Sequence, residues 1–415
     1  MKLNRREFIA GTTALSLAPL ASGMGVHQDK PSLKVGLIGC GGRGNGAIRN
    51  SFEAEKGAVL WAIGDVFPDR VNSSYDGLVK DLGAQCKIDD RKFSGFDAYQ
   101  KVIESGVDVV ILTTPPAFRP IHFEAAVKAG KHVFMEKPVA VDGPGVRAVI
   151  QAAKLAKSKK LTVVAGTQRR HDLGYQEVMK RIKGGEMGEI VQMNCWWNQG
   201  GLWMNPRQAN WSDMEWQLRN WLYFAWLSGD HIVEQHVHNI DVCLWAMGTH
   251  PVKATCLGGR QVRTDPAYGH IFDHFATEYE FANGVKMMSQ CRQIDGCASR
   301  VAEEIIGTKG RSNAGSNISG AKEFSYKGQK INPYVNEHAR LYKSIRANEG
   351  FNEGEQVAES VLTAIMGRMS AYSGQEVSWA QALASNVSLG PKNFSMNASV
   401  KVDPIAVPGQ TKDAF

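Results

Sequence analysis

The sequence predicts an α/β protein with an N-terminal Rossmann domain and a C-terminal α+β domain whose sheet is open and mainly antiparallel. Three observations carry this prediction. A glycine-rich turn directly follows the first apolar run. Apolar runs then alternate with helix-like stretches up to residue 165, which indicates βαβ units and a parallel sheet. Later runs alternate between apolar and polar residues without long helices between them, which favours antiparallel pairing.

The elements follow in order along the chain. In the first half we expect strands at 33–40, 58–63, 107–112, 132–135 and 161–165, and helices at about 45–56, 121–129 and 144–157. In the second half we expect strands at 188–200, 252–262, 272–281 and 284–294, and helices at 171–184, 231–247, 336–347 and 355–371. These elements divide the chain into an export signal and linker (1–27), a cofactor domain (32–165), a substrate and oligomerisation domain (166–380) and an irregular tail (381–415).

The N-terminus has the pattern of a twin-arginine export signal. Arg5 and Arg6 precede a mildly apolar run that ends at small residues 21–23. The run is shorter than the ~20 residues that span a bilayer, so we expect no membrane segment. A disordered basic N-terminus is the alternative. Export in the folded state would place the protein in the periplasm with its nucleotide already captured.

The composition excludes several classes of protein. Apolar residues make up 43% and charged residues 21% of the 415 residues, which is typical of a globular chain with two cores. The net charge of +7 is scattered rather than clustered, so we expect no nucleic-acid partner. The seven cysteines form no Cys-x-x-Cys pair, which argues against a structural zinc site or a disulfide framework.

The glycine turn has the spacing of a dinucleotide-binding loop. It follows a strand, opens a helix and contains Gly39, Gly41, Gly42 and Gly44 around Arg43. Glycines allow the tight turn and let the backbone approach a pyrophosphate, while the helix N-terminus favours the phosphate charge. This pattern predicts a nucleotide cofactor.

Asp65, at the end of the second strand, favours NAD over NADP. A carboxylate there accepts hydrogen bonds from ribose hydroxyls and repels a 2′-phosphate, although it could also be a helix cap. Arg43 is the residue that could instead reach a 2′-phosphate. The turn formed by Thr113, Thr114, Pro115 and Pro116 closes the next strand and should line the cofactor cleft. His122 follows it, as a cofactor contact or as a packing residue.

Residues 134–138 (Phe-Met-Glu-Lys-Pro) end a predicted Rossmann strand about a hundred residues after the glycine loop. Together the two motifs resemble the Gfo/Idh/MocA family (glucose–fructose oxidoreductase, inositol dehydrogenase and rhizopine-catabolism proteins), from about residue 33 to 380. The resemblance implies that Lys137 lies beside the nicotinamide and hydrogen-bonds the reacting hydroxyl, with Glu136 shaping the turn that aims it. A surface lysine before a proline is the alternative.

The family's second signature is an acidic residue four positions before a histidine. Here these are Glu234 and His238, and the resemblance implies that His238 is the general base and Glu234 its acidic partner. On one helix, His231 and Asp241 would share their polar face. The family usually has Asp in place of Glu234 and a small residue in place of His236, so the substrate pocket should differ. One alternative is that Glu234 and His238 only hydrogen-bond each other in the core. Another is a metal site on this face, although we expect no metal.

Tryptophans point to a carbohydrate. Seven of the ten lie within 196–226, where indole faces could stack on sugar rings, or else fill an oligomer interface or a compact core. We expect Trp203, Arg207, Arg169, His231 and Asp241 to contact substrate.

These observations predict an enzyme that transfers a hydride between a sugar or cyclitol and a tightly held NAD. Glycoside cleavage through transient oxidation of the sugar ring and nonenzymatic sugar binding are the alternatives. The family resemblance further implies a homodimer or homotetramer.

Overall fold

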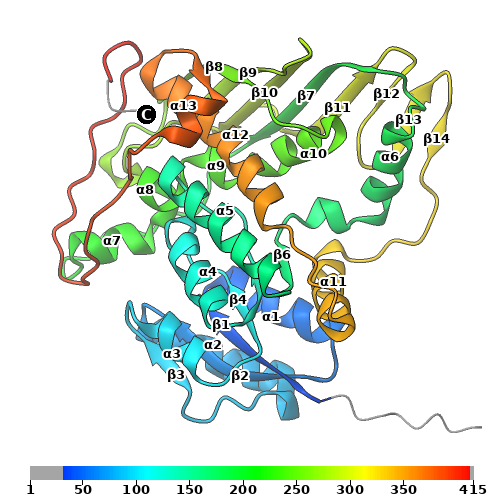
Figure 1. Cartoon of the computed structure of the whole chain (residues 1–415). Helices are drawn as coiled ribbons and strands as arrows, with labels where there is room; N and C mark the ends of the chain where they lie inside the picture. Colours follow the sequence, from blue (N-terminus) through cyan, green and yellow to red (C-terminus); the bar gives the residue numbers. More distant parts are fainter. Residues whose placement is uncertain (1–30, 412–415) are drawn as a thin grey trace, which may run out of the picture. The chain divides into compact units, whose positions relative to one another are not determined.

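The first sheet consists of six parallel strands in the order β3-β2-β1-β4-β5-β6 (Figure 1). The structure, a computed structural model, describes residues 31–411, so the predicted export signal lies outside the described residues. The strands are β1 (Leu33–Ile38), β2 (Ala58–Asp65), β3 (Lys92–Ser94), β4 (Val109–Leu112), β5 (His132–Met135) and β6 (Val163–Ala165). The predicted Rossmann sheet is confirmed. Only the short, polar β3 escaped prediction.

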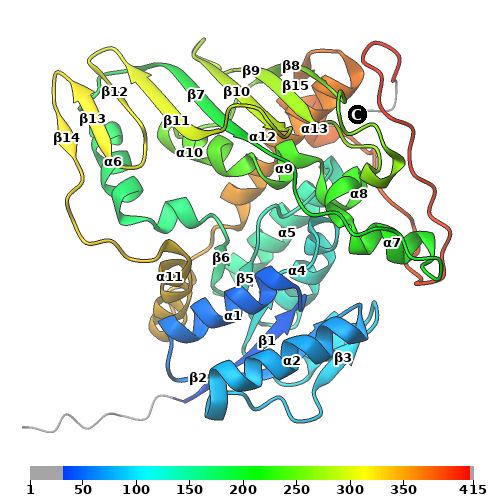
Figure 2. The same cartoon turned by 180° about the vertical axis from the view of Figure 1, so that it is seen from behind.

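Helices cover both faces of this sheet (Figures 1 and 2). One face carries α1 (Gly42–Ala54) and α2 (Pro68–Leu82), and the other carries α3 (Ala98–Glu104), α4 (Arg119–Lys128) and α5 (Gly143–Ser158). The α1 helix begins inside the glycine loop, and α5 begins where the Asp142 carboxylate accepts a hydrogen bond from the Gly145 N–H at 2.8 Å. The cofactor loop is thereby fixed between two packed layers.

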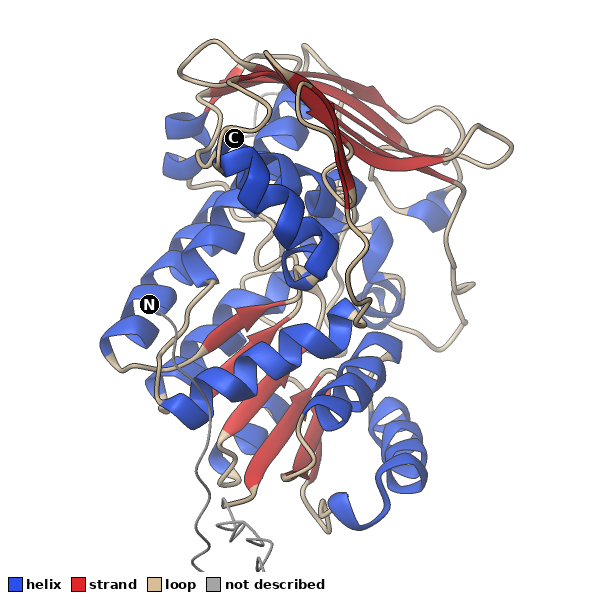
Figure 3. Cartoon of the chain, turned by 90° about the vertical axis from the view of Figure 1, so that its right-hand side faces the viewer, coloured by secondary structure: helices blue, strands red, loops and turns tan. Residues whose placement is uncertain are grey.

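The second sheet has nine strands in the order β14-β13-β12-β11-β7-β10-β9-β8-β15. All neighbours pair antiparallel except β7 and β10, so the predicted open, mainly antiparallel sheet is confirmed. The strands are β7 (Ile190–Gln199), β8 (Lys253–Gly259), β9 (His274–Glu280), β10 (Lys286–Gln293), β11 (Arg300–Gly307), β12 (Gly310–Ser312), β13 (Asn317–Gly320), β14 (Phe324–Ser325) and β15 (Val377–Ser378). Helices lie on one face of this sheet only (Figure 3).

The helices of the second half are α6 (Leu173–Lys183), α7 (Asp213–Arg219), α8 (Ala225–Ser228), α9 (His231–Glu234), α10 (Val237–Met247), α11 (Pro333–Ala347), α12 (Gly354–Ser373) and α13 (Trp379–Ala384). Two of them return to the Rossmann sheet: α11 packs on α1, and α12 packs on α5. Tyr342 on α11 hydrogen-bonds Ser51 at 2.6 Å, and Ser344 bonds Thr162 at 2.8 Å. The last elements of the chain therefore complete the cores around its first ones.

The predicted continuous helix over 231–247 is wrong, because the chain breaks between α9 and α10. The His236 side chain is fully buried beneath the second sheet, where its Nε2 lies 2.7 Å from the Ser289 hydroxyl on β10. The interruption therefore lies at Gln235 and His236, where the His236 side chain contacts the second sheet. Within the described chain, no helix is both long and apolar enough to cross a membrane.

Candidate active site

The glycine loop forms a cradle whose four glycines have two different roles. A Cβ on Gly44 would lie 2.0 Å from the Gly39 carbonyl oxygen, and one on Gly39 (φ +105°) would lie 2.6 Å from the Thr114 nitrogen. These two positions must be glycine for the turn itself to pack. A Cβ on Gly42 would meet no atom within 4 Å. Gly41 and Gly42 therefore leave room on the open side, which is where a pyrophosphate fits against backbone N–H groups.

Asp65 is held at the edge of this cradle by the backbone. Its carboxylate accepts hydrogen bonds from the Cys40 N–H at 2.7 Å and the Phe67 N–H at 3.0 Å. The side chain is 7% exposed, and burial raises the pKa of Asp65. Two backbone donors orient the carboxylate toward the cleft, where it can accept a hydrogen bond from a ribose hydroxyl.

A cleft of about 640 Å³ runs along the glycine loop. Nine residues predicted to bind the cofactor line it: Gly39, Gly41, Gly42, Arg43, Gly44, Asp65, Thr113, Thr114 and Pro115. Its other wall comes from Trp203, Asn205 and Trp221 of the second half. The cleft thus brings the glycine loop, Asp65 and the turn after β4 together along one cavity, as dinucleotide binding requires.

A narrower slot of about 50 Å³ continues from the cleft past Asp65. Its walls are aromatic, from residues that the sequence analysis did not single out: Phe67, Phe96, Tyr99 and Phe118. His122 lines it too, stacked on Tyr99 with ring centroids 4.3 Å apart. Arg70 lines both cavities and makes no ion pair within residues 31–411. The rings that line the slot offer flat faces on which an aromatic base can stack.

Arg119 is a fully buried residue that the sequence analysis missed. It joins the ends of β4 and β5: its Nε donates to the Glu136 carbonyl oxygen at 2.9 Å, and its Nη2 donates to the Thr114 carbonyl oxygen at 2.6 Å. Burial lowers the pKa of Arg119 to about 10. A charged residue at the start of a helix that packs on the sheet was the only signal for it. Pro116 is buried nearby and lines neither cavity.

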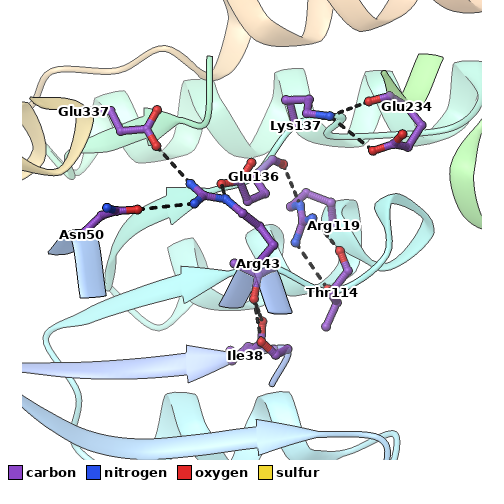
Figure 4. A network of polar contacts seen from close by, with 11 residues as sticks. Ile38, Arg43, Asn50, Thr114, Arg119, Glu136, Lys137, Glu234 and Glu337 are labelled. Atoms are coloured by element: carbon purple, nitrogen blue, oxygen red, sulfur yellow. Dashed lines mark hydrogen bonds and ion pairs between the residues drawn. The ribbon is translucent and has the colours of Figure 1, made fainter. Parts of the chain in front are cut away.

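The Arg43 side chain points toward Glu136 and Glu337 (Figure 4). It pairs with Glu136 and, at 3.2 Å, with the buried Glu337 on α11. Arg43 thus lines the cleft with its charge already paired, and its reach toward a 2′-phosphate stays a prediction. Glu337 was not foreseen, because it lies almost three hundred residues from its partner. Glu136 lines neither cavity and acts through Arg43 and Arg119.

Lys137 and Glu234 meet across the two halves of the chain (Figure 4). The Lys137 Nζ donates to the Glu234 backbone oxygen at 2.5 Å and lies 3.3 Å from the Glu234 Oε1. Their side chains are 10% and 12% exposed. The ammonium group is thus fixed at the end of β5, with a remaining N–H available to an incoming oxygen.

His238 lies in the electric field of this pair. Its ring stacks on Trp197 of β7 with centroids 5.8 Å apart. Burial and the positive charges of Lys137 and Arg169 hold the pKa of His238 well below its usual range. No hydrogen bond of its ring is found among the described residues, so the predicted pairing with Glu234 is absent and Glu234 holds Lys137 instead. The ring is neutral at neutral pH and can accept a proton.

Arg169 and Glu303 form a second buried ion pair, and the Arg169 charge also acts on His238. It contacts Glu303 of β11 at 2.5 Å, and Glu303 also accepts hydrogen bonds from Tyr175 at 3.0 Å and Asn239 at 2.6 Å. The Arg169 guanidinium lies 5.5 Å from the Trp197 ring centroid. Arg169 is thus close to the site but already has a partner.

His231 and Asp241 do not join this group, which corrects the expectation that both share its polar face and contact substrate. Asp241 is 1% exposed and accepts bonds from Arg170 at 2.8 Å and from Ser360 at 2.7 Å. His231 is fully buried against Phe275, with ring centroids 5.2 Å apart. The break before α10 separates the four residues. Among residues 31–411, no group of three His, Cys, Asp or Glu side chains is arranged to hold a metal ion.

The two remaining predicted substrate residues lie on the loop that follows β7. Trp203 lines the cofactor cleft and is 46% exposed. Arg207 pairs with Asp213 at 2.7 Å and lines neither cavity. Most other tryptophans of the cluster pack into a core around α7 and α8, as the interface-or-core alternative had it.

Fold and site define a class: a Rossmann dinucleotide-binding protein whose second, α+β domain brings a histidine close to a lysine at the nucleotide site. Comparison with known families agrees. Residues 33–167 match an oxidoreductase family with an NAD-binding Rossmann fold, and residues 175–312 match the GFO/IDH/MocA C-terminal domain. The chain belongs to the Gfo/Idh/MocA family.

Several curated relatives are named inositol 2-dehydrogenase. That of Azotobacter vinelandii is 28% identical over 261 residues, which is 62% of this chain and 66% of the relative. That of Klebsiella pneumoniae strain 342 is 31% identical over 167 residues, 40% of this chain and 45% of the relative. The chain thus spans just under two thirds of the first relative and less than half of the second.

Solved structures share the fold. An aldose–aldose oxidoreductase from Caulobacter crescentus in complex with glycerol superposes with a TM-score of 0.67 at 18% identity, covering 84% of this chain and 99% of the other. A scyllo-inositol dehydrogenase from Lactobacillus casei with bound NAD(H) and scyllo-inositol gives 0.63 at 20% identity, with coverage of 84% and 99%.

Proposed function

We propose that the protein is an NAD-dependent oxidoreductase that acts on a hydroxyl group of a sugar or cyclitol. The observation that carries the proposal is the placement of Lys137, which Glu234 holds at the end of β5 and whose positive charge acts on the neutral His238. A bound nicotinamide would supply the hydride acceptor for this chemistry. The names of the curated relatives support a cyclitol or sugar as the substrate class.

The residues of the chain divide the proton chemistry between them. His238 takes the hydroxyl proton, because its ring is uncharged and makes no hydrogen bond within residues 31–411. The Lys137 ammonium donates to the same oxygen and stabilises the negative charge that develops there. Glu234 fixes the ammonium in place and keeps the local charge balanced.

The charge pairing favours a neutral polyol over a phosphorylated sugar. Each cation near His238 has an acidic partner: Lys137 has Glu234, Arg169 has Glu303, and Arg43 has Glu136 and Glu337. Among residues 31–411, no cation is left unpaired around His238 for a phosphate or carboxylate, whereas hydroxyl groups need only hydrogen-bond donors and acceptors.

We further propose that the cofactor is NAD. The Asp65 carboxylate at the end of β2 supports this, because a carboxylate there accepts hydrogen bonds from ribose hydroxyls and repels a 2′-phosphate. Arg70 could reduce this preference, because it lines the same cleft and has no acidic partner within residues 31–411.

We also propose twin-arginine export from the N-terminal pattern. The bare face of the second sheet, where Leu257 is 76% exposed, supports a homodimer or homotetramer.

The test is incubation of the purified protein with NAD and a panel of cyclitols, aldoses and glycosides, with NADH absorbance and aglycone release followed together. Accumulation of NADH with an inositol or sugar, lost in Lys137→Ala, supports the proposal. Aglycone release without net NADH would replace it with glycoside cleavage by transient oxidation. A bound sugar with neither signal would replace it with sugar binding alone.

A further inference from the structure

The segment 200–221, here called the clamp, forms one wall of the cofactor cleft although it belongs to the second half of the chain. Trp203, Asn205 and Trp221 of the clamp face the glycine loop and Arg70 across the cleft. At the other end, Leu218 of the clamp lines the aromatic slot. The clamp therefore reaches both parts of the nucleotide site.

Hydrogen bonds hold the clamp in one shape. The Tyr223 hydroxyl donates to the Trp203 carbonyl oxygen at 2.7 Å. Asn205 and Asn220 bond each other twice: the Asn205 N–H donates to Asn220 Oδ1 at 2.8 Å, and Asn220 Nδ2 donates to the Asn205 carbonyl oxygen at 2.9 Å. A loop with this many internal bonds presents the 46% exposed Trp203 in a fixed position.

The clamp is tied to the strand end that carries Asp65. Arg219 pairs with both carboxylate oxygens of Asp69 at 3.2 Å, and its guanidinium lies 4.0 Å from the Phe67 ring centroid. Behind the clamp, the C-terminal tail supports it: Gln217 Nε2 donates to the Val400 carbonyl oxygen at 2.6 Å, and the Phe394 ring lies 5.7 Å from that of Phe96 in the slot wall. Figures 1 and 2 show the tail running along α7.

We propose that the clamp covers the bound dinucleotide, with Trp203 as a cofactor contact rather than a substrate contact, so that the cofactor leaves slowly. This inference rests on the proposed NAD binding. The Trp203 indole is about half exposed. Its flat face can pack against the C–H face of a ribose and exclude water from it. Release then requires the Arg219–Asp69 pair to open first.

The test measures dissociation of NADH by the decay of energy transfer from tryptophan after dilution into excess NAD. We expect Trp203→Ala to raise the dissociation rate about tenfold, and Trp203→Phe to retain most of the slow rate. Asp69→Arg should also release NADH faster, and the double variant Asp69→Arg/Arg219→Glu should restore slow release. Trp379→Ala is the control, because Trp379 stacks on His250 away from the cleft, with ring centroids 3.7 Å apart.

The outcomes separate this inference from the proposed function. If wild-type protein binds no NADH, the proposed function fails. If it binds NADH but Trp203→Ala and Asp69→Arg release it at the wild-type rate, the clamp is overturned. An increase in KM for the sugar with unchanged NADH release in Trp203→Ala would return Trp203 to the substrate site.

Discussion

The cofactor cleft and the reacting centre gather their residues in different ways. The first wall of the cleft comes from short stretches of chain, 39–45, 65–73 and 113–115, each at the end of a parallel strand. The reacting centre joins positions 137, 169, 234, 238 and 303 from both sheets. A site that one supersecondary unit builds is visible as a motif, whereas a site between packed elements depends on tertiary contacts.

The largest expected effect is a loss of turnover that leaves the cofactor cleft intact, which distinguishes the reacting centre from the cleft. Replacing Lys137 by Ala should lower kcat by about a thousandfold, because the developing negative charge loses its ammonium donor. The dissociation constant for NAD should change less than about threefold, since the glycine loop is untouched. Steady-state kinetics and titration with NADH measure both. Lys157→Ala is the control, as Lys157 is exposed; an equal loss of affinity and turnover in Lys137→Ala would contradict its assigned role.

Two glycine variants test the cofactor side alone. Gly44→Ala places a Cβ 2.0 Å from the Gly39 oxygen, so it should lower both the thermal stability and the NAD affinity, the latter by about a hundredfold. Gly42→Ala has open space for its methyl group in the protein. It should therefore keep the wild-type Tm and lose affinity only. Calorimetry and NADH titration check both, and a loss of Tm in Gly42→Ala would show that the open side of the cradle is structural.

The pH profile tests the reacting centre. Because burial and nearby cations hold the pKa of His238 below its usual range, the acid limb of kcat/KM should lie well below pH 6.5. Arg169→Gln removes one of these cations and leaves the Glu303 charge, so the limb should move upward by about half a pH unit. An unmoved limb in this variant would argue against His238 as the base.

The smallest expected effect is on the pH dependence of folding stability, through His122 in the wall of the slot. Burial, with a further contribution from the positive charge of Arg119, lowers the pKa of His122 from its ordinary 6.5 to about 3 in the folded state. Between these values the unfolded chain binds the extra proton, so stability falls as the pH falls. At pH 5 this costs about 2 kcal/mol relative to pH 8. Urea unfolding of His122→Phe should show a smaller loss over this range; an identical loss would place the linkage elsewhere.

The sequence predicted the elements whose chemistry is local. The glycine loop, Asp65 and the strand end before Lys137 lie where their patterns placed them, because each follows a buried strand of a parallel sheet. The partners of these residues could not be predicted. Glu337 reaches Arg43 from α11, and Arg119 gives no pattern beyond a charge at a helix start.

The error at His231 and Asp241 has a physical cause. Helical periodicity assumes that a helix continues, and the residues around His236 give no proline or glycine to end it. The break lies at Gln235 and His236, where the His236 side chain bonds Ser289 on a strand about fifty residues later in the chain, a tertiary contact that periodicity does not reveal. The same limit explains Trp203, which composition assigned to a sugar and which the fold places on the cofactor cleft.

The return of α11 to the first sheet sets an order of events during synthesis. The glycine loop has left the ribosome long before residue 347, yet the apolar faces of α1 and β6 that Leu341 and Tyr342 cover stay open to water until α11 arrives. Arg43 likewise lacks its Glu337 partner until α11 has been synthesised. A nascent chain that lacks α11 has an incomplete Rossmann domain with apolar surface exposed to water. The nucleotide-binding half therefore depends on the end of the chain. A chain stopped before residue 333 is expected to aggregate rather than bind nucleotide.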